Sequence, residues 1–270
     1  MTLRAYRTFR RALAKGRIYN SDATMFLSAL KSDSADIVFL DPPFNLNKDY
    51  GSDTARDRRP EDQYEAWLQE HILHSIRILR PGGALYIYHL PKWAMILGNS
   101  LQQEMEFRHW VAISMKNGFA RGKRLYPAHY ALLYFTKGAP ATFNRPKLPV
   151  TLCRHCQKPT KDYGGYSRIV EENGLNLSDF WEDLSPVRHR TTKHRIQNEL
   201  PRRMLSRIVA ISGLAGGCYV DPFAGSGVGA LEAAKAGMTF LVNDMSRSSC
   251  DVIVERLSRH STERHREHTN

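Results

Sequence analysis

Short apolar runs alternate along this chain with longer segments in which apolar residues recur at helical spacing. Ile37–Leu40 and Ala84–Tyr88 are short runs of this kind, typical of buried strands in a parallel sheet. Between them a helix is expected from about Gln63, and it should stop at the breaker Pro81-Gly82-Gly83. The apolar face of that helix is Trp67, Leu68, Ile72, Ile76 and Leu79.

The same alternation continues on both sides of this unit. Further short strands are expected at Arg17–Tyr19, Trp110–Ser114, Tyr130–Phe135, Cys218–Val220 and Phe240–Val242. Further helices are expected through Met25–Leu30, from Pro201, from Gly227 and through Val252–Leu257. Strands and helices in alternation predict an α/β fold, with a mostly parallel sheet and helices on both faces.

A long polar segment divides this alternating pattern into two parts. It is weakly periodic and rich in Pro, Gly, Lys, Arg and His, which is typical of an irregular basic insertion. The predicted division is a first half at residues 1–138, the insertion at 139–195, a second half at 196–258 and a disordered tail at 259–270.

The net charge of the chain indicates a polyanionic partner. The 270 residues include 39 Lys and Arg against 27 Asp and Glu, so the net charge is +12. Such an excess favours nucleic acid as a partner, and a basic surface without one is the alternative that charge alone does not exclude. No apolar run approaches the roughly 18–20 residues that cross a bilayer, so no membrane partner is expected.

A glycine-rich turn follows the strand expected at Cys218–Val220. Asp221 ends that strand, and Gly225-x-Gly227 precedes a helix, so a ligand can approach the backbone where a side chain would block it. Compared with a dinucleotide fingerprint the third glycine is displaced, but an acidic residue, Asp244, ends the following strand. A purely structural turn is the alternative. The two acidic residues favour a nucleoside-containing cofactor.

A second motif, Asp41-Pro42-Pro43-Phe44, follows the strand at Ile37–Leu40. Successive prolines remove backbone donors and leave carbonyl acceptors. A carboxylate with an adjacent carbonyl suits an exocyclic NH₂ group, which offers two donors. Phe44 adds a flat face on which a base could stack. The motifs lie 180 residues apart, yet both end strands whose carboxyl ends should share one sheet edge.

Together these motifs resemble the paired signature of S-adenosylmethionine-dependent DNA amino-methyltransferases. Their order, with the Asp41 motif first, resembles the β group, a permuted class I, Rossmann-like methyltransferase fold. The resemblance implies S-adenosylmethionine as cofactor, double-stranded DNA as substrate, base flipping and methylation of adenine N6. The catalytic residues it implies are Asp41, Pro42, Pro43 and Phe44. The cofactor-binding residues it implies are Asp22, Ala23, Asp41, Asn198, Glu199, Leu200, Asp221, Phe223, Ala224, Gly225, Ser226, Gly227 and Asp244.

Several alternatives stay open within this resemblance. Asp41 in the first position resembles adenine enzymes, whereas cytosine-N4 enzymes more often carry Ser there. Methylation at cytosine C5 is disfavoured because none of the four cysteines follows a proline. Methylation of RNA or of a protein amide, and a DNA-binding module without turnover, are further alternatives.

Basic and aromatic residues of the loops are predicted to contact DNA. They are Lys48, Tyr50, Arg121, Lys123, Arg124, Lys161, Tyr163, Arg188 and Arg190. Cys153 and Cys156 have zinc-knuckle spacing but lack a matching second pair, so no metal is predicted. A cytoplasmic, nucleoid-associated enzyme of a restriction-modification system is expected, with a homodimer and a cognate endonuclease as candidate partners.

Overall fold

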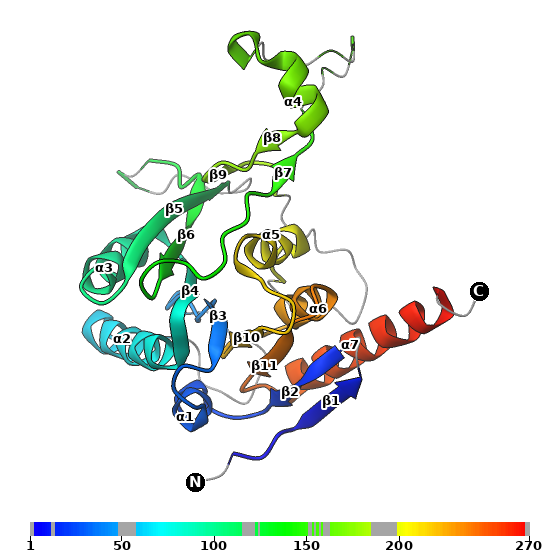
Figure 1. The fold of residues 1–270 in the computed structure, drawn as a ribbon. Coiled ribbons are helices and arrows are strands. Elements are labelled where there is room, and N and C mark those ends of the chain that lie inside the picture. Colours follow the sequence, from blue (N-terminus) through cyan, green and yellow to red (C-terminus); the bar gives the residue numbers. More distant parts are fainter. Residues whose placement is uncertain are drawn as a thin grey trace.

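The alternating pattern forms a nine-stranded sheet with helices on both faces (Figure 1). The computed structural model describes residues 3–11, 14–47, 58–114, 122–123, 125–150, 153, 155–156, 158, 163–184 and 199–267. Its strands are β1 (Arg7–Arg11), β2 (Ala14–Tyr19), β3 (Ala35–Leu40), β4 (Leu79–His89), β5 (Glu106–Ser114), β6 (His129–Thr136), β7 (Lys147–Leu148), β8 (Leu175–Asn176), β9 (Phe180–Trp181), β10 (Cys218–Asp221) and β11 (Thr239–Asn243). Its α-helices are α1 (Ala23–Ala29), α2 (Glu61–Ile78), α3 (Pro91–Leu101), α4 (Ser167–Asn173), α5 (Arg202–Ser212), α6 (Val228–Lys235) and α7 (Arg247–Glu267).

The strand order of the main sheet is β1-β2-β11-β10-β3-β4-β6-β5-β9. The five adjacent strands β2, β11, β10, β3 and β4 run parallel to one another. β1 and β6 pair antiparallel with their neighbours. β10 and β11 therefore lie between β2 and β3, although β2 and β3 follow one another in the chain. This arrangement makes the two motif-bearing strands, β3 and β10, direct neighbours.

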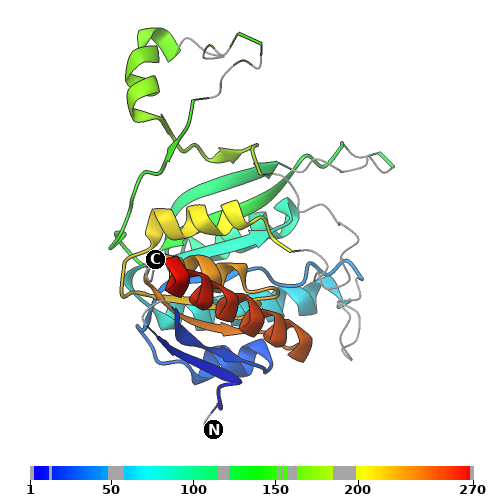
Figure 2. The same cartoon turned by 90° about the vertical axis from the view of Figure 1, so that its right-hand side faces the viewer.

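Side chains of the parallel strands alternate between two cores. Ile37 and Phe39 of β3 point to one core, and Val38 and Leu40 point to the other. Helices α5, α6 and α7 cover the first face, and α1, α2 and α3 cover the second, as the views of Figures 1 and 2 agree. Continuous apolar strands thus become buried on both sides, as parallel strands require.

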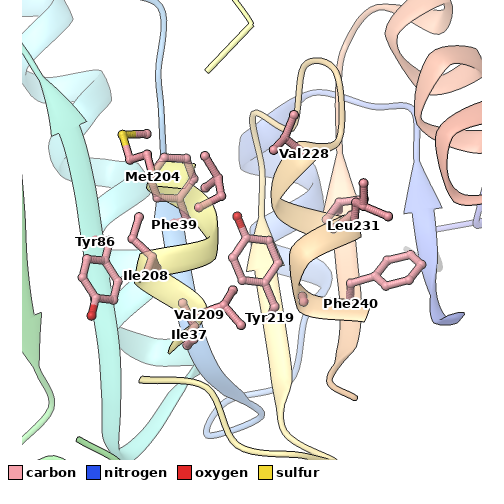
Figure 3. Packing of buried hydrophobic residues seen from close by; sticks show 14 of the residues in the cluster. Ile37, Phe39, Tyr86, Met204, Ile208, Val209, Tyr219, Val228, Leu231 and Phe240 are labelled. Carbon is pink, nitrogen blue, oxygen red and sulfur yellow. The ribbon is translucent and has the colours of Figure 1, made fainter. Parts of the chain in front are cut away.

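The core under α5 fixes β3 and β10 relative to each other. Met204 and Ile208 of α5 lie over Phe39 of β3, and Tyr219 of β10 stands beside them (Figure 3). All four side chains are at most 1% exposed. Because such close packing resists small displacements, the strand ends that follow are held in a constant relation.

The insertion is more regular than the polar composition indicates. Helix α4 and the antiparallel pair β7 and β8 project away from the main sheet (Figures 1 and 2). The chain then returns, and β9 pairs in parallel with β5 at the sheet edge. Trp181 of β9 is 1% exposed and Arg207 lies over its ring, so the insertion ends as part of the core.

Residues 259–267, which belong to the tail predicted to be disordered, continue helix α7 to Glu267. Ile253 and Leu257 bury one side of the helix against the sheet. Arg259 pairs with Glu255 one turn earlier, which supports the helix beyond its buried part. Within the described ranges, every helix is too short or too polar to span a lipid bilayer.

Candidate active site

The two motifs leave neighbouring strands at the same sheet edge. Tyr219 and Val220 of β10 pair with Ile37 and Val38 of β3, and both strands run in the same direction. The turn that begins at Asp41 and the glycine turn after Asp221 therefore start side by side, although the chain separates them by 180 residues. The structure thus brings the two predicted motifs together at one edge of the sheet.

Aromatic rings surround the end of the Asp41–Phe44 turn. Phe44 stacks on His89 with ring centroids 4.7 Å apart and an interplanar angle of 21°. Tyr88 and Tyr130 contact Phe44 at 5.8 and 5.9 Å. Burial and then the nearby Asp41 carboxylate raise the pKa of both tyrosines, so both stay neutral at physiological pH. Asp41 thus lies beside an uncharged aromatic wall.

Helix α2 connects the two motifs. The Tyr64 hydroxyl donates a hydrogen bond to the Pro43 carbonyl. Trp67 and His71 contact the Phe223 ring at 5.7 and 5.5 Å. Tyr64, Trp67 and His71 share one face because they lie three and four residues apart. Sequence reasoning predicted this helix from its apolar residues and did not identify the face of Tyr64 and His71 as part of the site.

The glycine turn is built from backbone hydrogen bonds to acidic side chains. The Gly225 N–H donates to the Asp244 carboxylate at 2.8 Å, and the Ser246 N–H donates to the same carboxylate at 2.8 Å. Gly225 and Gly227 have φ of 50° and 72°, in the left-handed region that favours glycine. A Cβ on Gly225 would meet no heavy atom within 4 Å, whereas one on Gly227 would lie 2.7 Å from Ile253. Of these two glycines of the turn, Gly225 is therefore the one that faces open space.

The turn before α1 joins the end of β11. Ser21 N–H and Oγ donate to Asn243 Oδ1 at 3.1 and 2.8 Å, and Asn243 Nδ2 donates back to the Ser21 carbonyl at 3.0 Å. The Asp22 carboxylate accepts from the Thr24 and Met25 N–H groups and caps α1. Ala23 is buried at the first helical position. The predicted Asp22 segment and Asp244 therefore lie close together.

The segment before α5 is anchored to α7. The Glu199 carboxylate pairs with Arg256 at 3.1 Å, and Leu200 packs on the core beneath the sheet edge. Asn198 lies outside the described residues.

The structure describes only part of the predicted DNA contacts. Lys123 is exposed in the chain between β5 and β6, and Tyr163 begins a short 3₁₀ helix (Tyr163–Gly165) beside α4. The remaining predicted contacts, which lie outside the described residues, are Lys48, Tyr50, Arg121, Arg124, Lys161, Arg188 and Arg190. No group of three potential metal ligands occurs among the residues the structure describes, Cys153 and Cys156 included.

Asp221 of the second motif is a buried carboxyl group. Its carboxylate accepts from Phe223 N–H at 3.0 Å and from the Tyr219 hydroxyl at 3.1 Å, and burial raises the pKa of Asp221 to about 7. The folded protein therefore holds this proton more tightly than the unfolded chain, in which Asp titrates near pH 4. This contribution to stability is complete below about pH 4 and is lost as pH rises to about 7.

Asp221→Asn is accordingly expected to flatten this part of the pH–stability curve. The variant keeps the shape of the side chain but carries no titrating proton. The difference in free energy of unfolding between variant and parent should grow in favour of the variant as pH rises to about 7, by roughly 4 kcal/mol in all. Urea denaturation of both proteins between pH 4.5 and 8 measures the difference. If the two curves of stability against pH stay parallel, the pKa of Asp221 is the same in the folded and the unfolded protein.

Comparison with known proteins decides the family. Residues 35–255 match the N6_N4_Mtase family, described as DNA methylase. This chain belongs to that family. The type II methyltransferase M.BamHI of Bacillus amyloliquefaciens is 39% identical to this chain over 251 residues, covering 90% of this chain and 57% of M.BamHI. The type II methyltransferase M.HpaI of Haemophilus parainfluenzae is 28% identical, covering 89% of this chain and 70% of M.HpaI. The chain thus spans a little over half the length of M.BamHI.

Solved structures of DNA methyltransferases share the fold. The M1.HpyAVI–SAM complex has a TM-score of 0.59 at 18% identity, covering 89% of this chain and 98% of that one. PvuII DNA methyltransferase, described as cytosine-N4-specific, has a TM-score of 0.65 at 12% identity, covering 96% and 95%. The predicted class I methyltransferase fold, with its mostly parallel sheet, and the resemblance to DNA amino-methyltransferases are both confirmed.

Proposed function

We propose that this chain transfers a methyl group from S-adenosylmethionine to the exocyclic N6 of adenine at a specific site in duplex DNA. The observation that carries the proposal is the meeting of the Asp41 turn and the open Gly225 turn at one sheet edge. The family match and the type II methyltransferases among the relatives support DNA as the substrate. The net charge of +12 suits the same partner.

The glycine turn fits a nucleoside-containing cofactor. Gly225 leaves room that a Cβ would fill, and the neighbouring Asp244 is the acidic residue that a ribose requires. The Phe223 ring lies against Trp67. This ring and the Ser21-Asp22 turn would enclose the remaining sides of the cofactor. When bound, S-adenosylmethionine supplies a methyl group on a positively charged sulfur atom.

The Asp41 turn would prepare the target amine. An aromatic amine is a weak nucleophile because its lone pair is delocalised into the ring. The Asp41 carboxylate and the Pro42 carbonyl would each accept one N–H of this amine, which favours a tetrahedral nitrogen and frees its lone pair. S-adenosylmethionine would supply the methyl group to this lone pair and keep the electrons of its C–S bond, and the Asp41 carboxylate would accept the surplus amine proton and release it to solvent. Positioning and electrostatics supply the catalysis.

The target base must leave the duplex to reach Asp41, because its amine is buried in the base stack. Phe44 is the stacking partner in this proposal. One face of its ring is already supported by His89, and its contacts with Tyr88 and Tyr130 fix its tilt. A ring held in this way loses little entropy when a base stacks on it.

Methylation of cytosine N4 is the second candidate function. The same fold serves the cytosine-N4-specific PvuII enzyme, whereas Asp41 in the first motif position favours adenine. Incubation with labelled S-adenosylmethionine and plasmid DNA, followed by mass spectrometry of the nucleosides, separates the two. N6-methyladenine is the expected product. N4-methylcytosine as the product would support the second candidate function. If the label is found only in RNA or protein, or in no product, the proposal of a DNA methyltransferase is contradicted.

Methylation is expected to slow steeply as salt is added. A protein that neutralises phosphates with Lys and Arg releases counterions, so its affinity falls as a power of the salt concentration. For six phosphate contacts the loss is roughly 10³-fold between 50 and 200 mM salt. Titration of a labelled duplex at several salt concentrations gives the slope. A slope near zero would show that the basic loops do not neutralise DNA phosphates.

The names of the relatives suggest the biological setting. Both are type II methyltransferases, so the chain is proposed to protect DNA against a cognate restriction endonuclease, in the cytoplasm and in contact with the nucleoid. A homodimer is a further proposal, and sedimentation of the purified protein with and without DNA tests it.

A further inference from the structure

We infer that His89 and Tyr64 are positioning residues that hold the Asp41–Phe44 turn in the geometry required for methyl transfer. The inference rests on the proposed function and adds two residues to it. Both come from outside the two motifs: Tyr64 lies in the first turn of α2, and His89 ends β4. They are 2% and 0% exposed, so neither is placed to contact solvent.

One main-chain donor sets the direction of the whole hydrogen-bond chain. The Leu90 N–H donates to His89 Nδ1 at 2.7 Å, so Nδ1 carries no proton. Burial lowers the pKa of His89 to about 3, so the ring is neutral and its proton is on Nε2. His89 Nε2 lies 2.8 Å from the Tyr64 hydroxyl oxygen and therefore donates to it. The Tyr64 O–H is then available to donate to the Pro43 carbonyl.

Anchoring the Pro43 carbonyl has a large effect on this turn because its other torsions are already restricted. The proline rings fix φ at Pro42 and at Pro43. The orientation of the Pro43 carbonyl depends on ψ of Pro43, which also sets the direction in which Phe44 leaves. A donor on that carbonyl therefore fixes the stacking ring relative to the Pro42 carbonyl, which is proposed to bind the amine.

His89 acts on the same turn a second time through its ring. Phe44 stacks on it at 4.7 Å, so one imidazole supports the Phe44 ring and orients the hydroxyl that holds Pro43. A charged imidazolium would have two donors and would repel the Leu90 N–H. The burial that keeps the ring neutral is therefore what allows the chain of donors to run toward Pro43.

Tyr64→Phe tests the inference directly. Single-turnover methylation at saturating DNA and cofactor should slow by roughly 10- to 100-fold, because small misplacements of reacting groups cost about that much. The dissociation constant for S-adenosylmethionine should stay unchanged. His89→Gln keeps an N–H donor and should retain more of the rate than His89→Leu. The double variant Tyr64→Phe/His89→Leu should be no slower than the slower single variant, because both changes break one hydrogen-bond chain.

Tyr86→Phe is the matched control. Tyr86 is a buried tyrosine of the same strand as His89, and its hydroxyl pairs with Ser212 at 2.7 Å, away from both motifs. It should lose stability with an unchanged methylation rate. If Tyr64→Phe behaves like Tyr86→Phe, or if the double variant shows the product of both single losses, the inference is wrong. A parent protein that methylates no DNA would instead contradict the proposed function.

A spectroscopic measurement tests the hydrogen-bond direction without any turnover. In ¹⁵N-histidine-labelled protein, the imidazole of His89 should show a protonated Nε2 and an unprotonated Nδ1 between pH 5 and 8. The assignment comes from the resonance that disappears in His89→Gln. A protonated Nδ1 would overturn the inference even in an active enzyme, because Tyr64 would then have to donate to His89 rather than to Pro43.

Discussion

Asp41→Asn is expected to abolish methyl transfer while leaving cofactor binding and stability largely intact. The amide has the size of the carboxylate but presents an NH₂ group in place of one acceptor, and it carries no charge. The target amine would then face a donor, and its surplus proton would have no carboxylate to leave through. Loss of one such electrostatic contact typically costs roughly 10²–10³-fold in rate, and reversal of its polarity should cost at least as much.

Asp33→Asn is the matched control for this change. Asp33 precedes β3 and Asp41 follows it, so the two carboxylates lie at opposite ends of one strand. Asp33 pairs with Lys137 at 2.8 Å, and at a φ of 51° Asn is tolerated as well as Asp. Single-turnover assays should show loss of rate in Asp41→Asn alone. Equal rates in the two variants would show that the Asp41 carboxylate takes no part in methyl transfer.

Gly225→Ala is expected to weaken cofactor binding, whereas Gly227→Ala is expected to lower the stability of the fold. Both positions have positive φ, so each variant pays roughly 1–2 kcal/mol of backbone strain. At Gly225 the added methyl group enters open space, and it should weaken S-adenosylmethionine binding by roughly 10- to 100-fold, as expected when a ligand's contact surface is blocked. At Gly227 the methyl group would meet Ile253 of α7, which should cost a further 1–3 kcal/mol of stability.

Calorimetric titration with the cofactor and urea denaturation distinguish the two effects. Gly225→Ala should lose affinity far beyond its small loss of stability, and Gly227→Ala should show the larger fall in its denaturation midpoint. Normal cofactor affinity in Gly225→Ala would mean that the ligand approaches the sheet edge from another direction.

Local patterns predicted the parallel core because its strands are buried on both faces. Ile37–Leu40 is apolar at every position, and β3 begins only two residues earlier, at Ala35. The proximity of Asp41 to the glycine turn also followed, since strand ends of a parallel sheet share an edge. The end of α2 was predicted less well. The helix ends at Ile78, and Pro81–Gly83 lies inside β4, where the Gly82 N–H and the Gly83 carbonyl bond to Lys137.

Other parts of the fold depend on partners distant in the chain. β1 is a polar edge strand and has no apolar alternation of its own, and β9 contains only two residues. The helix at Pro91–Leu101 does carry a periodic signal, with Trp93, Ala94 and Leu97 buried, but sequence reasoning passed over it. His89 and Tyr64 gave no local signal of a role, because their significance comes from a hydrogen bond between two elements.

The position of β10 and β11 in the sheet has a consequence for the order in which the protein can fold. During synthesis β2 and β3 emerge together, but they are not neighbours, and a gap two strands wide must stay open between them. Both inner edges expose unpaired backbone groups until β10 and β11 have been synthesised. Contacts this distant in sequence form slowly. The nascent chain therefore carries the complete Asp41 turn long before the glycine turn exists, and the two motifs can meet only when β10 and β11 close the sheet.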